Sequence, residues 1–258
     1  MLDRKTAAFQ RLLTVMDELR DKCPWDKKQT METLRNLTIE ETYELADAIL
    51  DKDMSGVKEE IGDLMLHMIF YAKIAEEKGE FDIADALEME CEKLIKRHPH
   101  VYGDLKVKDE EEVKQNWEQI KLRGGKKSVL EGVPNSLPAL VKAYRMQEKT
   151  KQVGFEWKTS EDVWSKVMEE LDEFRSVMTT DSATHEQKED EFGDLLFSLI
   201  NFGRYHGIEA ESALARVNKK FKQRFEYIES NASKSLMDMT LEEMDILWEE
   251  SKVSGVDS

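Results

Sequence analysis

Glutamates crowd together at two places in this sequence, in the segment EETYE at residues 40–44 and in EELDE at residues 169–173. Residues three apart on a helix lie on one face, so the paired glutamates of each segment would point in one direction. A second acidic pair, spaced ExxD, follows each segment further along the chain. The chain therefore offers two sets of four carboxylates: Glu41, Glu44, Glu60 and Asp63 in the first half, and Glu170, Glu173, Glu191 and Asp194 in the second.

Four carboxylates that turn into one cleft repel one another, and burying them costs many kcal/mol unless cations neutralise their charge. A set of oxygen donors without histidine or cysteine suits a hard ion such as Mg²⁺ or Mn²⁺. Such an ion readily takes phosphate oxygens as its remaining ligands. The carboxylate sets therefore predict two sites for Mg²⁺, with Mn²⁺ as a possible substitute.

An acidic pair at this spacing is also common on a solvated helix face, where it supports lysine partners. Repetition argues against that alternative, because in both halves the second pair begins a strongly apolar stretch, DLMLHMIF or DLLFSLINF. Gly62 and Gly193 precede the aspartates of these pairs. Since glycine inside a helix costs roughly 1 kcal/mol relative to alanine, its place in both copies predicts a close helix approach beside the metal cleft.

Two basic pairs also recur, Lys93 with Arg97 and Lys220 with Arg224. The members of each pair lie one helical turn apart, so they could hold the oxygens of an anion together. Ordinary surface basicity is the alternative for each pair alone. Carboxylates that hold metal ions and paired cations together describe a site for a di- or triphosphate.

Helices must position these residues. The four prolines occur at positions 24, 99, 134 and 138, which leaves the long stretches 25–98 and 139–258 without the residue that most strongly interrupts helices. Apolar residues recur there at intervals of three and four, and alternating β-branched runs are scarce. The sequence predicts an all-α fold.

The two halves of the chain are copies of one pattern. EETYELADAI followed by VKEEIGDLMLHMIFYAKI matches EELDEFRSVM followed by KEDEFGDLLFSLINFGRY, so the carboxylate sets correspond one to one. The segment 122–140 contains paired glycines and two prolines, which is typical of a connector. We expect an N-terminal module at 1–121, a linker at 122–140 and a C-terminal module at 141–258. Broad apolar helix faces such as DLMLHMIFYA predict that two copies pair as a homodimer.

Composition excludes several classes of partner. A formal net charge of −17 argues against a protein that coats nucleic acid or anionic lipid. The charged start of the chain lacks the apolar region of a signal peptide, and no apolar run approaches the ~20 residues that cross a bilayer. Cys23 and Cys91 have no paired spacing, so neither a disulfide framework nor a zinc site follows. We expect a cytoplasmic protein without nucleic-acid or membrane partners.

The order EExxE, spacer, ExxD, together with CPWDKKQT, RHPHV, VGFEW and LEEMDILW, resembles the MazG family of nucleoside triphosphate pyrophosphohydrolases. The match covers nearly the whole chain. The resemblance implies Mg²⁺-dependent hydrolysis of a nucleoside triphosphate to the monophosphate and pyrophosphate by a homodimer of tandem four-helix modules. In such proteins the metal ions clamp phosphate oxygens and activate a water molecule, while a carboxylate accepts its proton.

The resemblance also assigns roles to residues. Glu170, Glu173, Glu191 and Asp194 match the family's metal ligands, and the C-terminal module is the expected principal catalyst. Either Glu170 or Glu173 would be the general base, and the sequence does not choose between them. The residues that match nucleotide-contacting positions, or are further candidates for that role, are Lys166, Lys188, Lys220, Arg224 and Trp248, with Lys93 and Arg97 in the first module.

Other patterns have competing interpretations. A di-iron bundle would need Glu-x-x-His pairs, which the acidic segments lack. His98 and His100 flank a proline that ends a helix, which disfavours a metal site, and His67 is expected to be a hydrogen-bonded core residue. Trp25 and Trp157 either cap the core or border a base pocket. A nucleotide-sensing or partner-binding scaffold without turnover is the alternative function.

Overall fold

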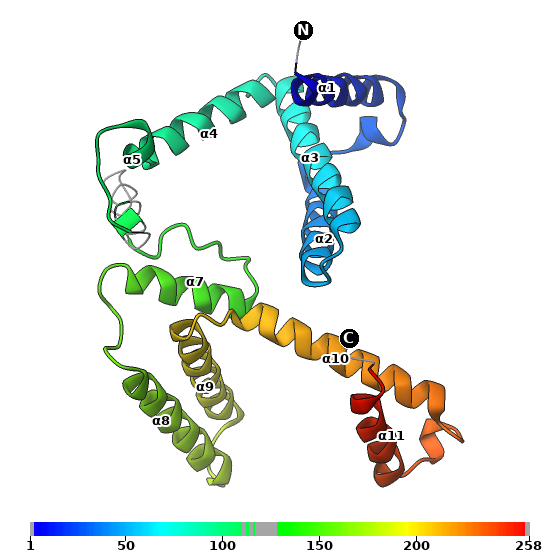
Figure 1. Cartoon of the computed structure of the whole chain (residues 1–258), viewed down its shortest axis with the longest axis vertical. Helices are drawn as coiled ribbons and strands as arrows, with labels where there is room; N and C mark the ends of the chain where they lie inside the picture. Colours follow the sequence, from blue (N-terminus) through cyan, green and yellow to red (C-terminus); the bar gives the residue numbers. More distant parts are fainter. Residues whose placement is uncertain (1–2, 110–111, 114–115, 117–127, 256–258) are drawn as a thin grey trace. The chain divides into compact units, whose positions relative to one another are not determined.

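The computed structural model describes residues 3–109, 112–113, 116 and 128–255. All regular structure among these residues is helical, and no strand occurs in them, which confirms the predicted all-α fold. The chain forms two compact units, Met1–Asp109 and Glu110–Ser258 (Figure 1). None of the described helices is long and apolar enough to cross a membrane.

The first unit is built around a helix hairpin. Helices α2 (Met31–Leu50) and α3 (Met54–Glu77) lie side by side, and a short turn joins them (Figure 1). A capping box at Thr30 starts α2, and the Asp53 side chain accepts from the backbone of Ser55 to start α3. The remaining elements are α1 (Arg4–Lys22), the short η1 (Asp26–Lys28), α4 (Ile83–Arg97) and α5 (Pro99–Tyr102).

Helix α1 packs against this hairpin through the core of the unit. The fully buried core consists of Met16 from α1, Leu34 from α2, and Ile69, Phe70 and Ile74 from α3. This core lies toward the end of the hairpin away from its turn, because Met16 meets the start of α2 and the second half of α3. Glu41, Glu60 and Asp63 lie on the same two helices, between this core and the turn.

The second unit repeats the same order of helices. Helices α8 (Ser160–Thr179) and α9 (His185–Tyr205) form the hairpin, and capping boxes at Thr159 and Thr184 start them. Helix α7 (Ala139–Lys151) packs on α9 as α1 packs on α3. The remaining elements are α10 (Ala210–Asn231), the short η2 (Leu236–Asp238) and α11 (Leu241–Val253). The repeated helix order confirms the tandem all-α architecture.

The predicted linker at 122–140 is only partly within the described residues, because 117–127 lie outside them. Its described part contains turns and ends as α7 begins at Ala139. The module boundaries at 121 and 141 remain predictions.

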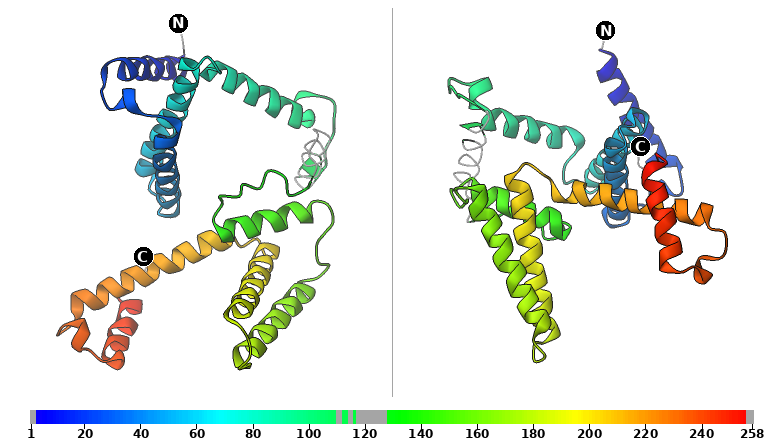
Figure 2. Two further views of the ribbon diagram at one scale, coloured as in Figure 1. Left: turned by 180° about the vertical axis from the view of Figure 1, so that it is seen from behind. Right: turned by 60° about the horizontal axis from the view of Figure 1, so that its bottom comes forward.

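The fourth helix of each unit projects from its hairpin. Figure 2 shows α10 running away from α8 and α9, with α11 packed on its far part. Large apolar side chains on these projecting helices are exposed, among them Leu87 and Leu94 on α4 and Val217 and Phe221 on α10.

An arginine ties three elements of the first unit together. The Arg20 Nε on α1 donates to Glu77 Oε1 on α3 at 2.9 Å, and its Nη1 donates to the backbone oxygens of Asp26 and Gln29. The guanidinium also lies 5.4 Å from the ring centre of Phe70. The hydrogen bond from Arg20 lowers the pKa of the Glu77 carboxyl.

We expect Glu77→Gln to lower the free energy of unfolding by up to about 1 kcal/mol at pH 7, because the ion pair is partly exposed. The folded-state pKa of Glu77 is depressed, so its contribution exists above the unfolded pKa and is lost as the pH falls below about 4. Urea unfolding of both proteins at pH 7 and pH 3 measures this. The neighbouring exposed Glu80→Gln is the control, and a difference between Glu77→Gln and wild type that persists at pH 3 would contradict the account.

Candidate metal centres

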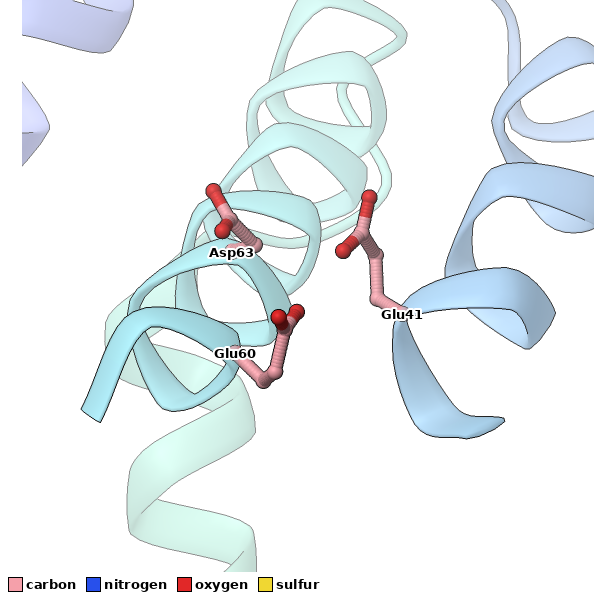
Figure 3. A group of neighbouring side chains, drawn as sticks. All are labelled: Glu41, Glu60 and Asp63. Carbon is pink, nitrogen blue, oxygen red and sulfur yellow. The ribbon is translucent and has the colours of Figure 1, made fainter. Parts of the chain in front are cut away.

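Each hairpin brings three acidic side chains together. In the first unit, Glu41 on α2 meets Glu60 and Asp63 on α3, and one carboxylate oxygen of each lies within 4.8 Å of the others (Figure 3). We name this group the first triad. The second triad consists of Glu170 on α8 with Glu191 and Asp194 on α9, and it meets the same distance limit. The structure thus gathers six of the eight predicted metal ligands.

The fourth predicted carboxylate of each set lies beside its triad. Glu44 and Glu173 are exposed, and neither places an oxygen within 4.8 Å of all three members. Their pKa values are nevertheless raised, first by desolvation and then by neighbouring charges, which include Glu60 for Glu44 and both Glu170 and Glu191 for Glu173. The charges of each triad therefore act on the neighbouring fourth carboxylate. Metal ligation by Glu44 and Glu173 remains a prediction.

The first triad suits a cation on electrostatic grounds. Desolvation is the main cause that raises the pKa of Glu41, and Asp63 and Glu44 raise it further. Desolvation also raises the pKa of Glu60, followed by its hydrogen bond with Glu41. The Glu60 Oε2 is buried and has no hydrogen-bond partner among the described residues. A buried acceptor without a donor, beside two more carboxylates, fits a hard divalent cation.

The second triad already has a cation at its edge. The Lys166 Nζ lies 2.7 Å from Glu170 and 2.8 Å from Glu169, and these hydrogen bonds raise the pKa of Lys166, that with Glu169 most. Glu170 is buried, with 7% of its surface exposed. The corresponding position in the first copy of the repeat is Leu37. The two triads therefore share their carboxylates and differ in their charge balance.

The glycines beside the aspartates do not serve close packing within the hairpins. A Cβ atom added at Gly62 or Gly193 would meet no described atom within 4 Å. The prediction of a close helix approach at these positions is wrong. The internal repeat shows that the two glycines occupy equivalent positions, but it does not show how near the facing helix lies.

The predicted basic residues lie apart from the triads in their own units. Lys220 and Arg224 are on α10, and the Arg224 guanidinium lies 5.4 Å from the ring centre of Trp248 on α11. These helices extend away from the α8–α9 hairpin (Figure 2). Lys93 on α4 pairs with Glu90, and Arg97 ends the same helix.

Besides Lys166, one more basic candidate, Lys188, lies on a helix that carries triad residues. It lies on α9 one turn before Glu191 and is half-buried. Its position on the helix keeps it a candidate for contact with an anion at the second triad.

The histidines differ partly from expectation. His67 is buried as predicted, but its Nδ1 has no hydrogen-bond partner in the described part of the chain, and desolvation lowers its pKa. The prediction that His67 is hydrogen-bonded is therefore wrong for its Nδ1. The rings of His98 and His100 lie 5.6 Å apart between centres and are tilted by 57°, and they belong to no group of three metal-ligating side chains among the described residues.

The two tryptophans that precede the hairpins do not cap the core. Trp25 is 55% exposed and Trp157 is 45% exposed. Trp157 instead lines a cavity, and its role at a base pocket remains a prediction.

This cavity, of about 510 Å³, lies in the second unit. Lys166, Glu170 and Asp194 form part of its wall, so it adjoins the second triad. The rest of the wall comes from Leu130, α7, α9 and the segment 154–157, and it includes Gln147, Phe155, Trp157, Phe197, Asn201 and Arg204. Phe155 and Trp157 belong to the VGFEW motif that the sequence offered, whereas Gln147 and Asn201 come together with them only through the packing of α7 on α9.

The fold and the triads define the class: an all-α protein with two helix hairpins, each of which carries a carboxylate triad that could hold a metal ion. The sequence profile of the MazG nucleotide pyrophosphohydrolase domain matches residues 29–102. A nucleoside triphosphate pyrophosphohydrolase of Escherichia coli is 40% identical over 96% of this chain and 98% of its own. The Thermotoga maritima protein named nucleoside triphosphate pyrophosphohydrolase/pyrophosphatase MazG is 43% identical over 95% of both chains. This chain also matches 51% of the uncharacterized Bacillus subtilis protein YabN, at 45% identity. The chain belongs to the MazG nucleotide pyrophosphohydrolase family.

We expect Mg²⁺ or Mn²⁺ to raise thermal stability, since a cation relieves the repulsion within the triads and binds only the folded state. At a hundred times its Kd, a bound ligand adds about 2.7 kcal/mol to the free energy of unfolding. Glu191→Gln should reduce this response, and Asp190→Asn, which changes an exposed neighbour outside the triad, should not. Melting curves with and without the ion measure the effect. The same response from all three proteins would argue against a cation at the second triad.

Proposed function

We propose that this protein hydrolyses nucleoside triphosphates to the monophosphate and pyrophosphate at the second triad, with Mg²⁺ as the metal ion. The observation that carries the proposal is the juxtaposition of that triad, the Lys166 ammonium and a cavity of about 510 Å³ large enough for a small molecule. The relatives that match nearly the full length of the chain carry the name of this activity, which supports the same conclusion.

The second triad has the donors that Mg²⁺ requires. Glu170, Glu191 and Asp194 would hold the ion through carboxylate oxygens, and no softer ligand is among them. When bound, the ion polarises the phosphate chain and offsets the negative charge of the departing pyrophosphate.

The remaining steps fall to side chains of this protein. Lys166 shares Glu170 with the triad, and its ammonium can balance part of the triphosphate charge from the cavity side. Glu173 is exposed beside the triad and its pKa is raised, which makes it the better of the two candidate bases. It would accept the proton of the attacking water, while the buried Glu170 stays paired with Lys166 and available to the ion.

The protein would act as a homodimer that completes each site. Lys220, Arg224 and Trp248 lie on helices that project away from the triad of their own unit, although they match nucleotide-contacting positions of the family. The same residues of a second copy can approach that triad from outside. Exposed apolar residues on α10, including Val217 and Phe221, would be covered by this pairing.

The first unit would bind a cation and contribute less to turnover. Its triad has Leu37 where the second unit has Lys166. Phe70, which is buried in the core, occupies the position in the repeat where Asn201 lines the cavity. These two replacements remove a cation and a polar cavity residue, so the first unit is the better candidate for binding without turnover.

We expect Asp194→Ala and Glu173→Gln each to lower kcat/KM by at least ~100-fold, because they remove a metal ligand and the proton acceptor. The matched changes Asp63→Ala and Glu44→Gln in the first unit should cost much less. Release of pyrophosphate from a common triphosphate measures all four variants. Equal losses in both units would show two equivalent active sites, and larger losses in the first unit would reverse the assignment.

If each site combines the triad of one chain with Lys220, Arg224 and Trp248 of the other, two inactive variants should restore activity when they form a mixed dimer. A mixed dimer of one Asp194→Ala chain and one Arg224→Ala chain contains one site with both changes and one site with neither. Random reassembly makes about half of the dimers mixed, so mixing the two proteins should restore roughly a quarter of the wild-type rate. Sites formed within one chain would give no recovery, because every site would carry one defect. Light scattering on the same samples should give the mass of a dimer, and a strictly monomeric mass would contradict this part of the proposal.

A further inference from the structure

The segment 154–157, between α7 and α8, forms part of the cavity wall and has little apolar anchorage of its own. Phe155 is 80% exposed, and Trp157 is also exposed. The backbone N–H groups of Gly154 and Phe155 donate to oxygens near the end of α7, so these bonds hold the segment to the helix that precedes it. They leave open its position relative to α9, the helix that carries two members of the second triad.

Arg204 connects α9 to this segment. Its Nη2 lies 2.6 Å from Glu156 Oε2, and its side chain is 2% exposed. Its Nε and Nη2 also donate to Asn201 Oδ1, one turn earlier on the same helix, at 3.2 and 2.8 Å, which fixes the direction of the guanidinium. The other oxygen of Glu156 accepts from the backbone N–H of Trp157 at 3.1 Å. Charge-assisted hydrogen bonds thus run from α9 into the aromatic segment.

The other ion pair of Arg204 has a counterpart in the first unit. The Arg204 Nη1 lies 3.2 Å from Glu148 on α7. The repeat places Lys73 at the position of Arg204, and the Lys73 Nζ lies 2.7 Å from Asp17 on α1. In each copy, therefore, a cation on the hairpin pairs with an acid on the helix that precedes the hairpin. This pair serves the packing of the helices in both units.

The turn before the hairpin is held differently in the two units. In the first unit, Arg20 of α1 donates to the backbone oxygens of Asp26 and Gln29, which ties the turn to the preceding helix. In the second unit, Arg204 reaches the turn from the helix of the triad and bonds the Glu156 side chain. This bond links the aromatic wall of the cavity to the scaffold of the candidate metal centre.

We propose that Arg204 is a positioning residue for the reaction: through Glu156 it holds the segment 154–157 as a fixed wall beside the second triad. The inference rests on the proposed function, because it names a residue that prepares the same site. Two carboxylates neutralise the Arg204 cation, which suits positioning better than contact with a phosphate. Without the bond, the segment leaves the wall part of the time, and the apparent affinity for the triphosphate falls by the fraction of molecules that keep it in place.

Glu156→Ala in the full-length protein tests the bond and leaves Arg204 paired with Glu148. Without ligand, the amides of Gly154 and Phe155 should exchange their hydrogens about 10-fold faster, because the segment opens more often. With Mg²⁺, the Kd for α,β-methylene ATP and the KM for a true triphosphate should each rise about 10-fold, while kcat stays within about twofold of the wild type. Glu156→Ser replaces this variant if it does not fold.

Glu148→Ala is the matched control, because it breaks the packing pair of the same arginine and keeps the bond to Glu156. It should lower the melting temperature and leave the exchange rates, the Kd and the KM unchanged. Glu156→Gln keeps an oxygen that can accept from Arg204, so it should restore most of the affinity. A direct effect of the Glu156 charge on the ligand would instead make this variant as weak as Glu156→Ala.

The inference is overturned if Glu156→Ala exchanges its amides and binds the analogue as the wild type does. It is also overturned if Glu148→Ala raises the KM equally, or if Glu156→Gln restores no affinity. A wild type that binds the analogue but releases no pyrophosphate from true triphosphates would contradict the proposed function. The exchange rates and the Kd values of the variants would then still decide whether Arg204 positions the segment.

Discussion

Repulsion among like charges is the constraint on which this structure depends. Three carboxylate oxygens lie within 4.8 Å of one another in each unit, on two helices that a short turn and a packed core hold in fixed register. Such groups do not gather unless the scaffold forces them together and something offsets their charge. The capped hairpins hold these side chains together, and the pKa values of Glu41 and Glu60 are raised, first by desolvation and then by the neighbouring carboxylates.

The two units differ in the residues that surround their triads. Lys166 neutralises part of the second triad, and an aromatic and amide-lined cavity adjoins it. In the first unit the equivalent positions hold Leu37 and Phe70, and Phe70 belongs to the core. Duplication thus preserved the carboxylates in both copies, while the surroundings that would hold a nucleotide are best developed in the second. The same helix pattern therefore carries a carboxylate triad with different surroundings in each copy.

The helices and the triads could be predicted from sequence because both follow from local spacing. Proline-free stretches with apolar residues at intervals of three and four predicted the helices, and pairs of acidic residues three apart, repeated in two copies, predicted which side chains would meet. The cavity could not be predicted in this way. Gln147 and Asn201 come from helices α7 and α9, whose approach depends on tertiary packing. The glycine interpretation failed for the same reason, since Gly193 shows nothing of how near another helix lies.

The central claim is that the second triad binds a divalent cation beside a bound triphosphate. Crystals grown with Mn²⁺ and α,β-methylene ATP would test it directly, because the anomalous signal of manganese locates the ion without reference to activity. The account predicts a manganese peak among the carboxylates of Glu170, Glu191 and Asp194, with the phosphates in contact with it. A bound nucleotide whose phosphates lie away from these carboxylates, with no manganese between them, would contradict the account.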